Sequence, residues 1–499
     1  MAGSRRDGRK RPPPSRSAAW LPVGVVLVVL AAAFASFEYD LAVELGWAEP
    51  GTASPASIEP PEGLDLPELS DPDAVAAPAG ASGTVSAAKV RSAISKYTTA
   101  SAFGPRRTLA IGGVDGTVHY ESRHAETIPA STMKILTGAA ALEALGSART
   151  FDTTVRVGAS ADEIVLVGGG DPYLMRKAEK DAYPAQADLV TLAARTAASL
   201  KEAGTTTVKL GFDDSLFSGP RVSEDWPADY VTDAVVSPIS ALFIDQGAKE
   251  GGWGFETDPA KAAADAFKQE LGKRGITVTG GARRTVAPSS TEVAPADEDV
   301  DSTQALTPGS ELAVVHSAPV WQIVERVLAI SDNEGAELLA HHVAIELGAE
   351  PSFEGGAIAV ETTLQQLGVD ITGDTILDAS GLSRGNVLTA STLLDVLSVA
   401  ASPEHPELRP VITGLPVAGF TGSLANRYAE APQAGAGRVR AKTGTLTGVH
   451  GLAGVTTDLD GNVFTFVFVA DRVKVEKTLD ARAALVDLTA ALASCHCSS

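Results

Sequence analysis

Three short motifs contain residues that together suit acyl transfer through a serine. They are Ser131-Thr-Met-Lys134, Ser331-Asp332-Asn333 and Lys442-Thr443-Gly444, in that order along the chain. A serine hydroxyl is a weak nucleophile that needs a base beside it, and lysine is one base that enzymes use for this purpose. The motifs therefore offer a nucleophile, proton-handling groups and a cationic strand to which a substrate can dock.

The spacing of Ser131 and Lys134 predicts that their side chains meet, because residues three positions apart lie on one face of a helix. The apolar and small residues 135–142 extend that helix. Its positive N-terminal end would favour negative charge on a substrate oxygen. To act as a base, Lys134 must have a pKa about three units below its usual value of about 10.4. We expect Lys442, a second cation, to supply part of that shift. The similar pair Ser86 and Lys89 is predicted to be an ordinary exposed helix start.

The segment Ser331-Asp332-Asn333 precedes a predicted helix that runs to His341. Taken alone, serine or aspartate before a helix is more often an N-cap than a catalytic group. In the catalytic interpretation, the Ser331 hydroxyl relays a proton between the leaving amine and Lys134, and the Asn333 amide holds the substrate carbonyl.

The alternation before Lys442 predicts that Lys442-Thr443-Gly444-Thr445 lies on a strand. Thr443 and Thr445 would offer hydroxyls to a carboxylate, and Gly444 would leave room for a substrate backbone. The backbone N–H groups of Thr445 and Ser131 would form an oxyanion hole. The alternative is a basic edge strand that resists aggregation.

The sheet that must carry these motifs is predicted to come from both ends of a folded body. A helix is predicted over residues 86–99, followed by a hairpin from Arg107 to Ser122 that turns at Asp115-Gly116. A second hairpin, over residues 453–470, precedes a helix from Lys477 to Leu492. The body is thus expected to span residues 86–150 and 306–499.

Residues 151–305 are predicted to be an inserted domain with short strands and helices near 187–203 and 258–274. The pair His341-His342 cannot face one metal from a helix, and we expect one buried and one exposed ring. Neither a metal nor an organic cofactor is predicted. For the C-terminal Cys495 and Cys497, the alternatives are a strained link between them or metal binding with outside help, and we expect a frayed end with no role.

The N-terminal region predicts export. Residues 1–17 form a basic leader, and residues 18–37 are apolar, which fits either a membrane anchor or a signal peptide. Residues 38–85 are rich in Pro, Ala and acids and are predicted to be a linker. The formal charge of −22 excludes nucleic acid as an expected partner, because an acidic surface repels phosphate. We expect the body to lie outside the cytoplasm, membrane-anchored or secreted.

The three motifs together resemble those of the penicillin-binding protein and serine β-lactamase superfamily. Longer stretches are similar to the class C low-molecular-mass penicillin-binding proteins, the D-alanyl-D-alanine carboxypeptidase/endopeptidase family of the penicillin-binding protein 4 type. These stretches are Gly168–Pro172, Phe212–Phe217, His316–Pro319, Asp378–Ser383 and Leu415–Gly419.

The resemblance implies an α+β fold with about five antiparallel strands flanked by helices, a helical subdomain and the inserted domain. It implies acylation of Ser131, with Lys134 as the base and with Ser331, Asn333, Lys442 and Thr443 completing the site. The expected substrates are peptidoglycan peptides ending in D-Ala-D-Ala, and β-lactams are expected to be inhibitors. Endopeptidase action stays open, and the alternatives are a serine β-lactamase and a non-enzymatic cell-wall scaffold.

Overall fold

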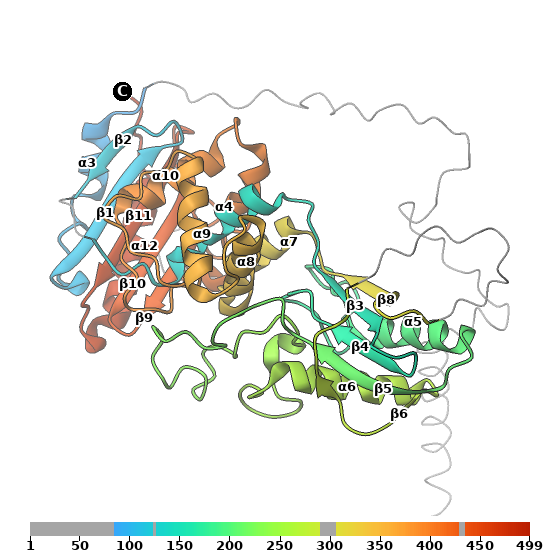
Figure 1. The fold of residues 1–499 in the computed structure, drawn as a ribbon. Helices are drawn as coiled ribbons and strands as arrows, with labels where there is room; N and C mark the ends of the chain where they lie inside the picture. The colour runs from blue at the N-terminus through green and yellow to red at the C-terminus, as the bar shows by residue number, and fades with distance from the viewer. Residues whose placement is uncertain (1–83, 123–125, 290–305, 429–434) are drawn as a thin grey trace, which may run out of the picture. The chain divides into compact units, whose positions relative to one another are not determined.

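The computed structural model describes residues 84–122, 126–289, 306–428 and 435–499 (Figure 1). One sheet has five antiparallel strands in the order β2-β1-β11-β10-β9. The strands are β1 (Arg106–Gly113), β2 (Val118–Glu121), β9 (Arg440–Leu446), β10 (Val449–Thr457) and β11 (Val463–Asp471). Strands β1 and β11 pair along their whole length, so the two ends of the chain share one sheet, as predicted.

Both predicted hairpins are confirmed. The first turns at Gly116, whose φ of 79° is a conformation that glycine adopts without strain. The side chain of Asp115 accepts a hydrogen bond from the backbone N–H of Thr117 at 3.0 Å and stabilises the turn.

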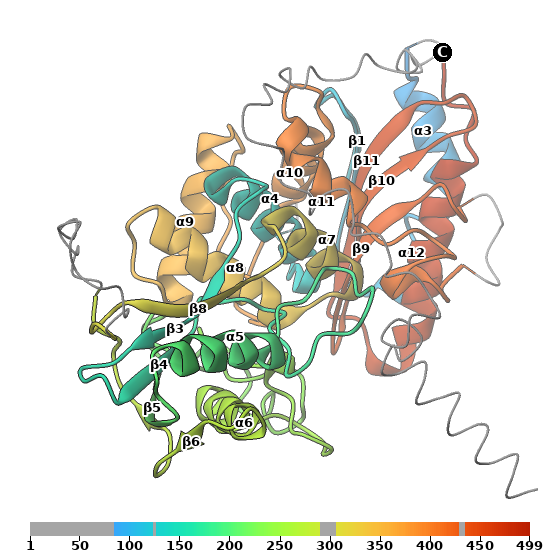
Figure 2. The ribbon, with the colours of Figure 1, turned by 90° about the vertical axis from the view of Figure 1, so that its right-hand side faces the viewer.

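Side chains alternate between the two faces of β11 and fill two cores. Phe464, Phe466 and Phe468 pack with α3 (Ala87–Ile94) and α12 (Thr478–Ala493), whereas Val467 and Val469 face the other helices. Figure 2 shows α3 and α12 on one side of the sheet and the remaining helices of this part on the other.

The C-terminal tail is an ordered part of this layer, so the prediction of a frayed end is wrong. Cys495 and Cys497 form a disulfide, and the carbonyl of Cys497 accepts a hydrogen bond from Ser86 N at 2.8 Å. The backbone N–H of Ser499 donates to Thr84 O at 2.8 Å. Sequence composition could not predict these backbone hydrogen bonds, because they join the tail to residues about 400 positions earlier in the chain.

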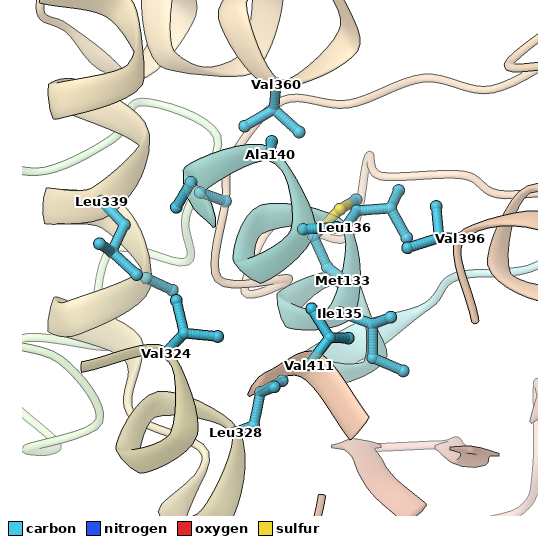
Figure 3. Packing of buried hydrophobic residues seen from close by; sticks show 14 of the residues in the cluster. Met133, Ile135, Leu136, Ala140, Val324, Leu328, Leu339, Val360, Val396 and Val411 are labelled. Carbon is cyan, nitrogen blue, oxygen red and sulfur yellow. The ribbon is translucent and has the colours of Figure 1, made fainter. Parts of the chain in front are cut away.

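The helix α4 (Lys134–Leu145) lies at the centre of the helical part (Figure 3). All of residues 134–142 are buried, as expected for a helix that is surrounded on every side. The small residues allow close packing: a Cβ added at Gly138 would lie 3.0 Å from Val324 Cγ1. The neighbouring helices are α7 (Val320–Ile330), α8 (Asn333–Glu346), α9 (Phe353–Gln366), α10 (Ala390–Ala401) and α11 (Arg409–Thr413).

A second sheet lies in the predicted inserted domain and has the order β6-β5-β4-β3-β8, with β7 pairing β5. Helices α5 (Leu189–Glu202) and α6 (Pro259–Lys273) pack on it. Its strands are β3 (Asp152–Val157), β4 (Glu163–Val167), β5 (Thr207–Asp213), β6 (Thr277–Val278), β7 (Arg283–Arg284) and β8 (Glu311–His316). Because β8 pairs with β3, this sheet extends past the boundary drawn at residue 305.

Short 3-10 turns connect several elements: η3 (Ser101–Phe103), η4 (Ala130–Met133), η5 (Asp245–Gly247), η6 (Pro406–Leu408), η7 (Gly422–Leu424) and η8 (Val475–Lys477). Between β5 and α6 the chain is otherwise mostly irregular. There Trp226, Val236 and Phe243 pack against Leu338 of α8 and Phe353 of α9.

No helix within the described residues is long and apolar enough to cross a membrane. The predicted leader, apolar segment and linker, residues 1–85, lie almost entirely outside the described residues.

Candidate active site

Ser131 lies in the 3-10 turn η4, one turn before α4 begins at Lys134, and not in the α-helix itself. Two close backbone approaches fix the turn. A Cβ at Gly381 would lie 2.0 Å from Ala130 O, and a Cβ at Gly444 would lie 2.6 Å from Pro129 O. The turn is therefore held between β9 and the 378–386 loop, and Ser131 is half-buried there.

Gly444 has a packing role that the sequence did not suggest. We expected it to leave room for a substrate backbone, and in the structure its missing side chain makes room for the turn that carries Ser131. The sequence indicated that another backbone comes close to Gly444. Only tertiary packing shows that this backbone is the one at Pro129.

The Lys134 side chain is fully buried and reaches three oxygens. Its Nζ lies 3.2 Å from Ser131 Oγ, 2.8 Å from Asn333 Oδ1 and 2.6 Å from Ser380 O. Asn333 Nδ2 donates to Val235 O at 3.0 Å, and this bond orients the amide with its oxygen toward Lys134. The structure therefore joins the first two motifs directly.

Burial lowers the pKa of Lys134 to about 8. Asp378, Glu337, Asp332 and Glu334 oppose that shift, because nearby negative charge stabilises the ammonium. We expected Lys442 to cause part of the lowering, but burial is the largest cause. Repulsion between the two lysines instead affects Lys442. Burial lowers the pKa of Lys442 well below its usual value, and the nearby Lys134 lowers it further.

The Ser331-Asp332-Asn333 segment connects two helices. Ser331 ends α7 in a left-handed conformation, with φ 64°, and Asp332 caps α8 by accepting a bond from Gly335 N at 2.9 Å. The N-cap, which was the alternative to a catalytic role for this segment, is therefore present, and Asp332 supplies it. Within the described parts of the chain, no hydrogen bond joins Ser331 to Ser131 or Lys134.

The third motif lies on β9 next to η4, as predicted for a strand. Lys442 is fully buried, and its Nζ donates to Thr443 O at 3.1 Å. The Thr443 hydroxyl donates to Ser423 Oγ at 3.0 Å, and Thr445 is exposed. No ion pair to Lys442 is found among the described residues.

The 378–386 loop contributes to the site, and sequence reasoning missed it. It carries the Ser380 carbonyl that Lys134 contacts. Its organiser is Asp378, a fully buried carboxylate that accepts hydrogen bonds from four donors. The donors are Gly381 N at 2.8 Å, Ser383 N at 2.6 Å, Asn386 Nδ2 at 2.7 Å and Trp226 Nε1 at 2.7 Å. The stretch Asp378–Ser383 had signalled only the family resemblance.

The region between β3 and β8 also bonds directly to α8 and its cap. Tyr173 Oη donates to Asp332 Oδ2 at 2.8 Å, and Ser237 N donates to Glu334 Oε1 at 2.7 Å. Together with Trp226, these contacts make this region part of the support of the site.

Within the described residues, no side chain of the three motifs belongs to a group that could hold a metal ion. Among the described residues, Glu143, His405 and Glu407 bring ligand atoms within 4.8 Å of one another, but they are exposed or half-buried and belong to none of the motifs. His341 and His342 are both buried, so the prediction of one exposed ring is wrong. The ring of Phe151 stacks on the ring of His342, with 3.7 Å between the centroids, and thereby covers His342.

Known proteins are similar in sequence to this chain over most of its length. The D-Ala-D-Ala carboxypeptidase 3 (S13) family matches residues 114–251 and 253–492. The chain is 34% identical to Carboxypeptidase DacB of Mycolicibacterium smegmatis, covering 74% of this chain and 76% of that protein. It is 30% identical to a D-alanyl-D-alanine carboxypeptidase of Actinomadura sp., covering 68% and 72%.

Among solved structures, penicillin binding protein 4 from Haemophilus influenzae is similar, with a TM-score of 0.63 and 21% identity. That match covers 82% of this chain and 98% of the other, and it confirms the predicted fold class. The family match and the two relatives show that the chain belongs to the D-Ala-D-Ala carboxypeptidase 3 (S13) family and is a serine-type peptidase of that class.

Proposed function

We propose that the D-Ala-D-Ala carboxypeptidase reaction of this chain proceeds through an acyl-enzyme on Ser131, with Lys134 as the general base. The observation that carries this proposal is the set of three oxygens around Lys134 Nζ. Asn333 Oδ1 and the Ser380 carbonyl can only accept hydrogen bonds, whereas Ser131 Oγ can also donate one.

A neutral amine has two N–H bonds and one lone pair. If the two N–H bonds point to Asn333 and Ser380, the lone pair faces the Ser131 hydroxyl and can take its proton. With a pKa of about 8, Lys134 is neutral in an appreciable fraction of molecules near neutral pH. Ser131 Oγ then attacks the carbonyl before the terminal D-alanine, and Lys134 holds the proton that Ser131 releases.

The remaining motif residues have proposed roles in binding and proton transfer. Lys442, with Thr443 and Thr445, would face the terminal carboxylate, which would supply the counter-ion that Lys442 lacks among the described residues. The backbone N–H groups of Ser131 and Thr445 would stabilise the oxyanion. Ser331 would return the proton from Lys134 to the leaving amine. Water then hydrolyses the acyl-enzyme and releases the shortened peptide.

Labelling of the full chain with a fluorescent penicillin tests the nucleophile, because a β-lactam offers an acyl group to the same serine. We expect a stable adduct in the wild type and none in Ser131→Ala. Ser86→Ala is the matched control, because Ser86 has the same spacing to Lys89 but its hydroxyl accepts from Lys89 N as a helix cap at 3.4 Å. An adduct that survives in Ser131→Ala would contradict the proposal.

The fate of the adduct separates the alternatives. Release of D-alanine from a pentapeptide, with slow loss of the penicillin adduct, supports the carboxypeptidase. Rapid turnover of penicillin would instead favour a β-lactamase. A folded wild type that neither reacts with penicillin nor releases D-alanine would favour the scaffold.

Membership of this family indicates action at the cell envelope, and we propose that residues 18–37 hold the body there. The basic leader and the length of this apolar segment support an anchor. The test is fractionation of cells that express the full chain or a chain lacking residues 1–37. Recovery of the full chain only in the soluble fraction, with a shortened N-terminus, would show a cleaved signal peptide instead.

A further inference from the structure

A buried carboxylate behind the Ser380 carbonyl has no place in the reaction described above. Glu337 is 1% exposed and lies on α8 four residues after Asn333, so both side chains lie on one face of the helix. Asn333 contacts Lys134 directly. Glu337 reaches instead to the 378–386 loop, whose Ser380 carbonyl is the other acceptor for Lys134.

The Glu337 carboxylate holds two successive backbone amides. Its Oε1 accepts from Ser380 N at 2.8 Å, and its Oε2 accepts from Ala379 N at 3.3 Å. On the other side, the carbonyls of the same two residues accept from α4: Ala379 O from Thr137 Oγ1 at 2.7 Å, and Ser380 O from Lys134 Nζ at 2.6 Å. The loop is therefore held between α8 and α4, and the position of the Ser380 carbonyl depends on both helices.

Charge adds a second effect to this geometry. The groups that face Lys134 are Glu337, Asp332 and Glu334 on α8 and its cap, Asp378 on the loop, and Lys442 on β9. Glu337 and Asp378 each raise the pKa of Lys134 against the lowering by burial. Asp378 also raises the pKa of Glu337, which burial brings to about 8. Glu337 thus gains its charge in the pH range in which Lys134 loses its own.

We infer that Glu337 is a positioning residue for the proposed general base, because it fixes the Ser380 carbonyl against Lys134. This inference rests on the proposed role of Lys134. It assigns a role in the reaction to a buried residue that touches neither Ser131 nor substrate.

The test is the rate of acylation of the full chain by a fluorescent penicillin, measured from pH 6 to pH 10. Glutamine has one acceptor oxygen, so Glu337→Gln leaves one of the two backbone N–H groups facing an amide N–H. We expect its plateau rate to fall about tenfold, the effect of one lost hydrogen bond. Because a negative charge near Lys134 is removed, the midpoint of the profile should move down by about one pH unit.

Two variants separate charge from geometry. Glu337→Asp keeps the charge but retracts the carboxylate by one methylene, so its rate should fall while its midpoint stays closer to the wild type than that of Glu337→Gln. Thr137→Val loosens the same loop without changing any charge, so its rate should fall with no shift of the midpoint. Thermal melting of each variant verifies that it folds.

The inference fails if Glu337→Gln folds and shows the plateau and midpoint of the wild type. If Glu337→Gln does not fold, Glu337→Asp decides, and a wild-type plateau there would overturn the inference. In both cases an acylated wild type leaves the proposed function intact. A folded wild type that is not acylated at any pH would overturn the proposed function and this inference with it.

Discussion

Replacement of Trp226 by phenylalanine tests whether the irregular segment after β5 supports the 378–386 loop. Trp226 is 5% exposed, and its indole N–H donates to the fully buried Asp378 at 2.7 Å. Phenylalanine keeps a ring against Phe353, whose centroid lies 5.0 Å away, but it removes the donor. Asp378 would keep three of its four donors.

The expected cost follows from the nature of this bond. A hydrogen bond to a charged group contributes about 1.5–3 kcal/mol, and the Asp378 side chain that would lose this donor is fully buried. We therefore expect the free energy of unfolding in urea to fall by about 2 kcal/mol. Because Asp378 shapes the loop that carries the Ser380 carbonyl, penicillin acylation should also slow several-fold.

Trp253→Phe is the matched control, since the same substitution is made at a side chain that is 80% exposed. Its effect on stability should stay within about 0.5 kcal/mol, with no change in acylation. Equal unfolding free energies for the two variants would refute the assignment of a structural role to the bond between Trp226 and Asp378.

Two further predictions concern the turn that carries Ser131 and the proposed base, Lys134. Gly444→Ala should reduce the rate of penicillin labelling at least tenfold, because the new Cβ would lie 2.6 Å from Pro129 O and must displace the turn that carries Ser131. A wild-type rate would show that the turn adapts freely. The rate of D-alanine release should rise with pH and reach half its maximum near pH 8, because the pKa of Lys134 is lowered to about 8 and the proposed base must be neutral to accept a proton. A rate that falls between pH 7 and pH 9 would contradict the proposed role of Lys134.

The elements of the fold were predictable where the signal is local. Turn residues such as Asp115-Gly116 and alternating apolar residues placed both hairpins within a few positions of the observed strands. The predicted boundary at residue 305 missed β8, because pairing between residues 152–157 and 311–316 leaves no mark in either segment alone. The ordered C-terminal tail was missed for the same reason.

The candidate site divides in a similar way. Ser131, Lys134, Asn333 and Lys442 were named from motifs, and the structure places Asn333 and Ser131 around Lys134. Glu337 and the Ser380 carbonyl could not be named, because buried carboxylates and backbone carbonyls look ordinary in a sequence. Their importance arises only from which groups surround them.

The sequence by itself determined the chemistry that is available, because a nucleophile, a lysine and an amide at recognisable spacings require only residue types. Tertiary structure alone decided the proton affinity of Lys134, since burial and carboxylates from two distant segments, residues 332–337 and Asp378, set it. It also decided that Gly444 accommodates the turn of Ser131. The physical reason is that desolvation and close packing depend on contacts between residues hundreds of positions apart, and no local pattern records them.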